Sequence, residues 1–193
     1  MRITGGMARG MAIGCGRKSS ARPATDAMRA ALFSSLASSG KSLSGARIMD
    51  IFAGVGSYGL EALSRGALHG HFVEISPANC RQIGVNLDGI SISAGVPRKN
   101  FTIRCGDAFS AKAEPFDFLF VDPPYELMEK RPGDCARLVG ALMGAANGDA
   151  VAAVEMPFGV EFPMPESLVQ LTAIGRRGRG SPQLLIFQRK SPA

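Results

Sequence analysis

Apolar runs of strand length alternate with helix-forming stretches along most of this chain. The runs are short and bounded by turn residues, as in buried strands, and they cover residues 46–52, 71–75, 101–105, 116–121 and 150–155. The stretches between them carry helix signals, at residues 26–38, 60–65, 77–88 and 134–146. This alternation predicts an α/β domain built on a mostly parallel sheet.

Two further strands are predicted near the end of the sequence, at residues 168–174 and 183–188. The connection between them is too short for a crossover helix, so these strands should pair antiparallel. The sequence therefore predicts a seven-stranded, mostly parallel sheet that ends in an antiparallel hairpin. The arginines of its loop, residues 175–180, meet either phosphate or only solvent.

The predicted helices carry recognisable end signals. Thr25 is placed to cap the helix at 26–38, and Asp26 favours its N-terminus. Ser76 and Pro77 begin the helix at 77–88, and Gly89 is expected to end it.

Acidic residues stand at the carboxyl ends of four successive predicted strands: Asp50, Glu74, Asp107 and Asp122. Open α/β sheets bind ligands at the edge where the carboxyl ends of parallel strands meet. The alternative is that these four acids are ordinary solvent-exposed residues at the ends of loops. Four acids in sequence, with a glycine turn after the first, favour a binding site.

That glycine turn contains Gly54, Gly56 and Gly59, whose spacing fits the dinucleotide-binding pattern. Glycines here let a ligand approach the backbone closely. Glu74 follows about 20 residues later, where an acid can take both ribose hydroxyls of an adenosine. Asp107 is placed to bond the adenine amino group. These features do not separate a nicotinamide cofactor from S-adenosylmethionine (SAM).

The sequence Asp122-Pro123-Pro124-Tyr125 follows the fourth strand. The two prolines fix the backbone and remove two N–H donors. The Asp122 carboxylate and the Pro123 carbonyl can therefore accept hydrogen bonds from an exocyclic amine, while the Tyr125 ring can stack on a base. A proline-rich turn without such a role is the alternative.

Charge is distributed unevenly along the 193 residues. Residues 1–29 hold six basic residues and one acid, residues 170–193 hold five basic residues and no acid, and the middle is acidic. Basic ends favour a nucleic-acid partner, with solvated termini as the alternative. With 46% hydrophobic residues, we expect one globular domain at 25–193, preceded by a basic arm or hairpin at 1–24.

The remaining residue types suggest a soluble protein of a reducing compartment. The four cysteines are far apart and predicted to be reduced and buried, and His69 and His71 are interpreted as strand-entry residues, so no metal site is expected. The sequence has neither an apolar run long enough to span a membrane nor a secretory signal, so we expect it in the cytoplasm.

Long motifs now point to a family. The stretch from Asp50 through Ala67, together with Asp122-Pro-Pro-Tyr125, resembles the RsmD-like 16S rRNA guanine-N2 methyltransferases. The opening Met-Arg-Ile-Thr-Gly-Gly and the segment Arg22-Pro-Ala-Thr-Asp26 resemble that family's N-terminal signature. Ser57 and Tyr58 depart from it, since smaller residues are usual there, and the rim of the cofactor pocket is therefore expected to differ. The loop of the final hairpin also departs from it, because it lacks an expected Tyr-Gly pattern.

The resemblance implies a class I SAM-dependent methyltransferase fold of the Rossmann-like type. It implies that SAM is bound by Asp50, Ala53, Gly54, Gly56, Glu74, Ile75, Asp107 and Ala108. It also implies that Asp122, Pro123, Pro124 and Tyr125 hold a guanine amine of 16S rRNA on an assembling small subunit. RNA phosphate is then expected at Arg2, Arg9, Arg17, Lys18, Arg22, Thr25 and Arg29.

The expected reaction is direct methyl transfer by a monomer, in which the enzyme supplies alignment and electrostatics. Other readings stay open at this point. The chain could methylate adenine in nucleic acid or a protein glutamine, it could be a non-catalytic RNA-binding assembly factor, or it could be a nicotinamide oxidoreductase. The oxidoreductase alternative gives no function to Asp122-Pro-Pro-Tyr125.

Overall fold

The computed structural model describes residues 1–15, 25–175, 178 and 180–190. Within them, seven strands form one sheet in the order β3-β2-β1-β4-β5-β7-β6. The strands are β1 Arg47–Ile51, β2 His69–Glu74, β3 Phe101–Cys105, β4 Phe118–Val121, β5 Val151–Pro157, β6 Leu168–Gly175 and β7 Pro182–Arg189. β1 to β5 pair in parallel and β7 pairs antiparallel with both β5 and β6, which confirms the predicted sheet.

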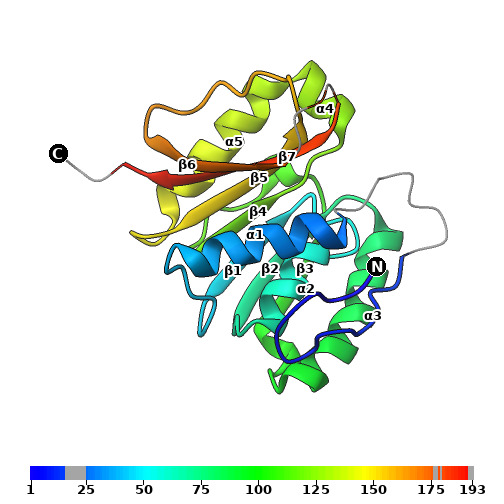
Figure 1. Cartoon of the computed structure of the whole chain (residues 1–193). Helices are drawn as coiled ribbons and strands as arrows, with labels where there is room; N and C mark the ends of the chain where they lie inside the picture. Colours follow the sequence, from blue (N-terminus) through cyan, green and yellow to red (C-terminus); the bar gives the residue numbers. More distant parts are fainter. Residues whose placement is uncertain (16–24, 176–177, 179, 191–193) are drawn as a thin grey trace.

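Helices cover both faces of this sheet (Figure 1). The helices are α1 Asp26–Ser38, α2 Ser57–Ser64, α3 Pro77–Ala94, α4 Tyr125–Lys130 and α5 Pro132–Ala145, with short 3-10 turns η1 Arg98–Asn100 and η2 Ala108–Ser110. Alternate residues of β4 enter two different cores: Phe118 and Phe120 pack with α1 to α3, while Leu119 and Val121 pack with α4 and α5.

Two helix predictions need correction. Gly89 does not end α3, which continues to Ala94 and is capped by Gly95 in the left-handed conformation. The cost of about 1 kcal/mol for a glycine within a helix is outweighed because Ile90 continues the buried stripe of Ile83 and Leu87. The second correction is α4, which begins at Tyr125, where the sequence predicted only a stiff loop.

Residues 1–15 form a hairpin. Arg2 and Ala12 make an antiparallel bridge, and Ile3, Ala8 and Ile13 are buried in the same core as α1, α2 and α3. The described part of the predicted N-terminal arm is therefore packed against the domain. Arg17, Lys18 and Arg22 lie outside the described residues, as do Arg176, Arg177 and Arg179 of the C-terminal loop.

The cysteine prediction is partly wrong. None of the four cysteines forms a disulfide, as expected, but Cys15 and Cys105 are exposed and only Cys135 is buried. Among the described residues, we find no helix with the length and apolarity that crossing a bilayer would require.

Candidate active site

A cavity of about 610 Å³ opens at the carboxyl edge of the sheet. The parallel register places the ends of β1, β2 and β4 side by side, with Ile51 opposite both Val73 and Val121. Six of the predicted cofactor residues line this cavity: Ala53, Gly54, Glu74, Ile75, Asp107 and Ala108. Residues 122–125 line it as well, so the structure brings the two halves of the predicted site together.

The glycine turn holds its shape through left-handed backbone. Gly54 has φ 57° and Gly56 has φ 85°, a region that other residues adopt only under strain. Between them and β1, Phe52 also has a positive φ, of 55°, and its side chain lines the cavity. Non-glycine residues in this conformation are uncommon and concentrate at functional sites.

Asp50 shapes this turn from inside the protein. Its side chain is 1% exposed, and its Oδ2 accepts a 2.8 Å hydrogen bond from the backbone N–H of Gly59 in the first turn of α2. Burial, opposed by that hydrogen bond, raises the pKa of Asp50 to about 8. Neither Asp50 nor Gly56 lines the cavity, so the part we predict for them in cofactor binding is confined to shaping the turn.

Glu74 is fixed by three donors. Its Oε2 accepts from the Gly54 N–H at 2.8 Å, and its Oε1 accepts from the Ser76 N–H at 2.8 Å and the Asn79 amide at 3.3 Å. A carboxylate has about four lone-pair sites, so it can accept further hydroxyl groups from a ligand in the cavity. Asp107 is exposed and caps η2 by accepting from the Phe109 N–H at 3.0 Å.

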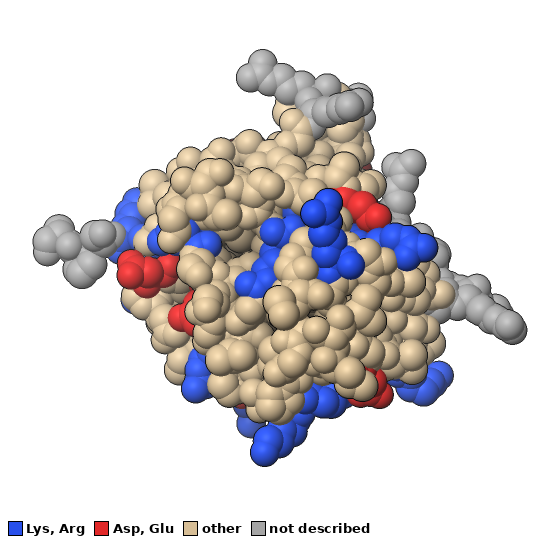
Figure 2. Space-filling view, turned by 60° about the horizontal axis from the view of Figure 1, so that its bottom comes forward, with Lys and Arg blue, Asp and Glu red and all other residues tan. Residues whose placement is uncertain are grey.

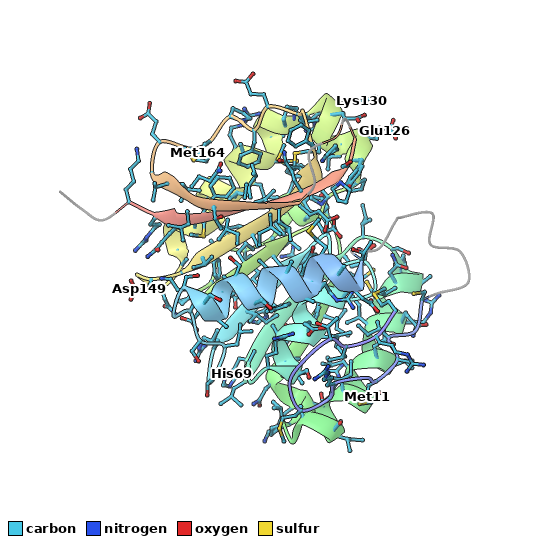
Figure 3. The ribbon with its side chains drawn as sticks, viewed as in Figure 1. Met11, His69, Glu126, Lys130, Asp149 and Met164 are labelled. Atoms are coloured by element: carbon cyan, nitrogen blue, oxygen red, sulfur yellow. The ribbon has the colours of Figure 1, made fainter. Side chains whose placement is uncertain are left out.

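The Asp122–Tyr125 bend forms the opposite wall. Pro123 is buried, and Pro124 precedes the first residue of α4, so the bend leads directly into a helix. Burial raises the pKa of Asp122 well above its ordinary value, and the nearby carboxyls of Glu155 and Asp50 raise it further. On the outer side of α4, Lys130 and Glu126 form a 2.6 Å ion pair that points away from the sheet (Figure 3).

Sequence reasoning missed two aromatic walls of the cavity. The rings of Phe52 and Phe109 meet edge to face with centroids 5.8 Å apart, and the Arg131 guanidinium lies 5.4 Å from the centre of the Phe109 ring. Their positions beside the glycine turn and just after Asp107 were the available signal.

It also missed Glu155, a buried carboxyl in β5 beside Asp122. The signal was the same one that identified the other four acids, because Glu155 lies towards the carboxyl end of a predicted strand.

Tyr58 does not lie on the cavity rim. Its ring is 2% exposed and stacks on Phe120 with centroids 5.7 Å apart, while the preceding Ser57 lines the cavity. Of the two residues that depart from the family pattern, Ser57 therefore changes the lining of the cavity and Tyr58 changes the layer beneath it.

The prediction that Arg29 meets RNA phosphate is wrong for this structure. The Arg29 side chain is fully buried, donates to the backbone carbonyl of Arg2 and pairs with Asp26 at 2.8 Å and with Glu61 at 3.7 Å. It lies on the same side of α1 as Phe33 and Leu36, one and two turns further on, all of them buried. Arg29 thus anchors the N-terminal hairpin.

The other described residues of the RNA prediction differ among themselves. Thr25 caps α1 by accepting from the Met28 N–H at 3.2 Å, as expected from the sequence. Arg2 and Arg9 are exposed, although the Arg2 guanidinium also donates to the Gly10 carbonyl at 2.8 Å. Figure 2 shows Lys and Arg side chains in separate groups on one face, with fewer acidic side chains among them. Contact of Thr25, Arg2 and Arg9 with RNA stays a prediction.

Comparison with known proteins gives consistent matches. A family model described as "Conserved hypothetical protein 95" matches residues 1–188. "Ribosomal RNA small subunit methyltransferase D" of Escherichia coli (strain K12) is 36% identical over 128 residues, which cover 65% of this chain and 60% of that protein. "Putative rRNA methyltransferase YlbH" of Bacillus subtilis (strain 168) is 31% identical over 127 residues, covering 65% and 67%. The chain thus spans between 60% and 67% of the length of these relatives.

Solved structures extend the likeness to the whole chain. "Putative methyltransferase yhhF" from Escherichia coli aligns with a TM-score of 0.79 and 27% identity, covering 100% of this chain and 99% of that one. A structure titled as a "putative methylase" from Haemophilus influenzae aligns with a TM-score of 0.73 at 22% identity, covering 98% of both chains. Together with the strand order, these likenesses confirm the predicted fold class.

Proposed function

Because the chain belongs to the family described as Conserved hypothetical protein 95, we propose that it is a SAM-dependent methyltransferase that modifies the exocyclic N2 amine of a guanine in 16S rRNA. The names of the E. coli and B. subtilis relatives support rRNA as the substrate class. One observation carries the proposal. The glycine turn at Gly54 and the loop at Glu74, which are expected to bind a nucleoside, line the same cavity as the Asp122–Tyr125 bend.

The residues of the cavity fit SAM. Glu74, held by three donors, would take the ribose hydroxyls, and Ile75, Asp107 and Phe109 would surround the adenine. The volume of about 610 Å³ falls within the usual range for a small-molecule site. When bound, SAM supplies an electrophilic methyl group on a positively charged sulfur.

The chain's own part in the reaction is to hold the amine. The Asp122 carboxylate and the Pro123 carbonyl would accept hydrogen bonds from the two N–H groups of the exocyclic amine. These bonds localise the lone pair on nitrogen, which is otherwise delocalised into the ring. The Tyr125 ring would stack on the extruded base, an interaction worth about 1–3 kcal/mol.

Asp122 accepts hydrogen bonds most strongly when it is ionised, because both of its oxygens are then acceptors. Burial and two neighbouring carboxyls raise the pKa of Asp122. A cationic ligand in the cavity lowers that pKa, because an opposite charge favours the ionised form. Ionisation of Asp122 is thereby coupled to occupation of the cavity by a cation.

The proposed partner is 16S rRNA within an assembling small subunit, and we propose that the protein binds it as a monomer. The exposed Arg2 and Arg9 of the hairpin would contact phosphate. An amine on adenine or glutamine could donate to the same Asp122 carboxylate and Pro123 carbonyl. Analysis of the methylated product therefore decides which amine receives the methyl group.

The test is methylation in vitro with the recombinant chain. Small subunits from a bacterial strain that lacks its own enzyme of this type are incubated with isotopically labelled SAM, and the nucleosides are separated by mass spectrometry. We expect label in N2-methylguanosine. Label in N6-methyladenosine, in ribosomal protein or in no product would overturn the guanine assignment.

A further inference from the structure

Glu155 is the only charged residue in the sequence of β5, every residue of which is buried. Its side chain is 4% exposed. Burial raises its pKa, because a carboxylate loses its hydration there. A buried carboxyl of this kind requires partners that satisfy its oxygens.

Those partners are the two tyrosines of the chain. The Tyr58 hydroxyl donates to Glu155 Oε2 at 2.5 Å. The Tyr125 side chain also interacts with the Glu155 carboxyl and lowers its pKa. Tyr58 comes from α2 and Tyr125 from the first turn of α4. Glu155 therefore joins one wall of the cavity to the core layer beneath it.

The sheet places this junction beside Asp122. β4 and β5 pair in parallel with Val121 opposite Val154, so the next residues along, Asp122 and Glu155, continue that register. The Tyr58 ring stacks on Phe120, two residues before Asp122, at an interplanar angle of 13°. Tyr58 and Glu155 thus both lie against β4, the strand that Asp122 follows.

We propose that Glu155 is a positioning residue for the amine site: it clamps Tyr125 through its hydroxyl so that the ring faces the amine held by Asp122 and Pro123. The inference rests on the proposed function, since it concerns the acceptor base of that reaction. The stacking surface of Tyr125 is useful only if its ring has one orientation, and Tyr125 is the first residue of a six-residue helix that has no side-chain cap. The interaction with a carboxyl buried in the sheet supplies that restraint.

The clamp also acts on the charge of Asp122. Glu155 faces Tyr58 on α2, Arg29 on α1 and Tyr125 on α4, and all three favour its ionised form. Asp122 in turn faces the carboxyls of Glu155 and Asp50. Replacing Glu155 by glutamine removes one of these two neighbouring carboxyls, and the pKa of Asp122 should fall.

The experiment compares Glu155→Gln with Glu161→Gln, an exposed acid in the connection that follows β5. Both substitutions remove one charge, and neither residue lines the cavity. Three quantities are measured: the affinity for S-adenosylhomocysteine, kcat with KM on small subunits, and the titration of Asp122 by carbon NMR of labelled carboxyls in the free protein.

For Glu155→Gln we expect unchanged S-adenosylhomocysteine affinity, a fall in kcat of about a hundredfold, as misplaced reacting groups cause, and an acid shift in the titration of Asp122. Glu161→Gln should match the wild type in all three. Tyr58→Phe, which keeps the stack on Phe120 and removes only the hydroxyl, provides a milder variant and should lower kcat without changing cofactor affinity.

If Glu155→Gln behaves like Glu161→Gln in both kcat and the titration of Asp122, the positioning role is wrong. Loss of folding in Glu155→Gln together with wild-type kcat in Tyr58→Phe would also overturn it. If the wild type methylates an amine other than that of guanine and Glu155→Gln still lowers kcat on it, the clamp stands and the guanine assignment alone fails, because the clamp acts on the amine site whichever base occupies it.

Discussion

The backbone N–H of Gly54 donates a 2.8 Å hydrogen bond to Oε2 of Glu74, which ties the glycine turn after β1 to the acid at the end of β2. One carboxylate therefore both fixes the turn and faces the cavity. The two halves of the proposed nucleoside site are therefore joined by a hydrogen bond.

Glu74→Ala should accordingly weaken S-adenosylhomocysteine binding by about a hundredfold, since ribose contacts and the fixed turn are lost together, each hydrogen bond to a charged group being worth about 1.5–3 kcal/mol. Titration calorimetry measures the change. Glu166→Ala, at an exposed acid, is the control and should bind as the wild type does. Equal affinity in both variants would remove Glu74 from the cofactor site.

Stability should depend on pH through Asp50. Its folded pKa is about 8, so the folded protein keeps this proton while the unfolded chain releases it above about pH 4. Stability therefore declines as pH rises from about 4 to about 8, by at most about 1.4 kcal/mol per pH unit for this group. Asp50→Asn retains an oxygen that can accept from Gly59 but cannot ionise.

We expect the unfolding temperature of Asp50→Asn to change less than that of the wild type between pH 5 and pH 8. Thermal unfolding followed by circular dichroism checks this, with the exposed Asp149→Asn as control. A variant whose pH dependence equals that of the wild type would show that Asp50 is already ionised when folded.

Gly59 is required by close packing. A Cβ at this position would lie 2.4 Å from the Phe72 ring and 3.0 Å from Asp50 Oδ2. Gly59→Ala should destabilise the protein by about 1–3 kcal/mol, the usual cost of overpacking. Gly144→Ala in α5 is a matched control with no atom near its Cβ, and it should be neutral or stabilising by up to about 1 kcal/mol. Urea unfolding separates the two; equal effects would contradict the close contact.

Substitutions of Arg29 and Arg9 should affect different properties, the stability of the fold and the affinity for RNA. Arg29→Ala leaves Glu61 buried with one partner fewer, so unfolding free energy should fall by about 3–5 kcal/mol. Arg9→Ala, at an exposed hairpin position, should leave stability unchanged and reduce RNA affinity in a salt-dependent way. Unfolding curves and filter binding at two salt concentrations distinguish them. Wild-type stability in Arg29→Ala would refute the anchoring role.

Much of the fold could be predicted from the sequence because the strands are short apolar runs and the turns carry glycine or proline. β3 and α1 have the predicted bounds, and the antiparallel pairing of β6 with β7 followed from the length of their connection. The end of α3 could not be read from Gly89, since tertiary burial of Ile90 decides it.

The site was predictable where one local signal marks one residue. An acid at a strand end identified Glu74, Asp107 and Asp122, and the structure places all three on one cavity. Arg29 was assigned to RNA because charge is visible in a sequence and burial is not. Tyr58 and Glu155 are 97 residues apart in the sequence, and such a pairing depends on the assembled sheet.

The most direct test of the central claim, that the Asp122 bend presents an amine to a methyl donor in the same cavity, is the single-turnover rate of Asp122→Ala on small subunits with saturating SAM. We predict a rate at least about a hundredfold below that of the wild type, with S-adenosylhomocysteine affinity unchanged. A rate equal to that of the wild type would contradict the account.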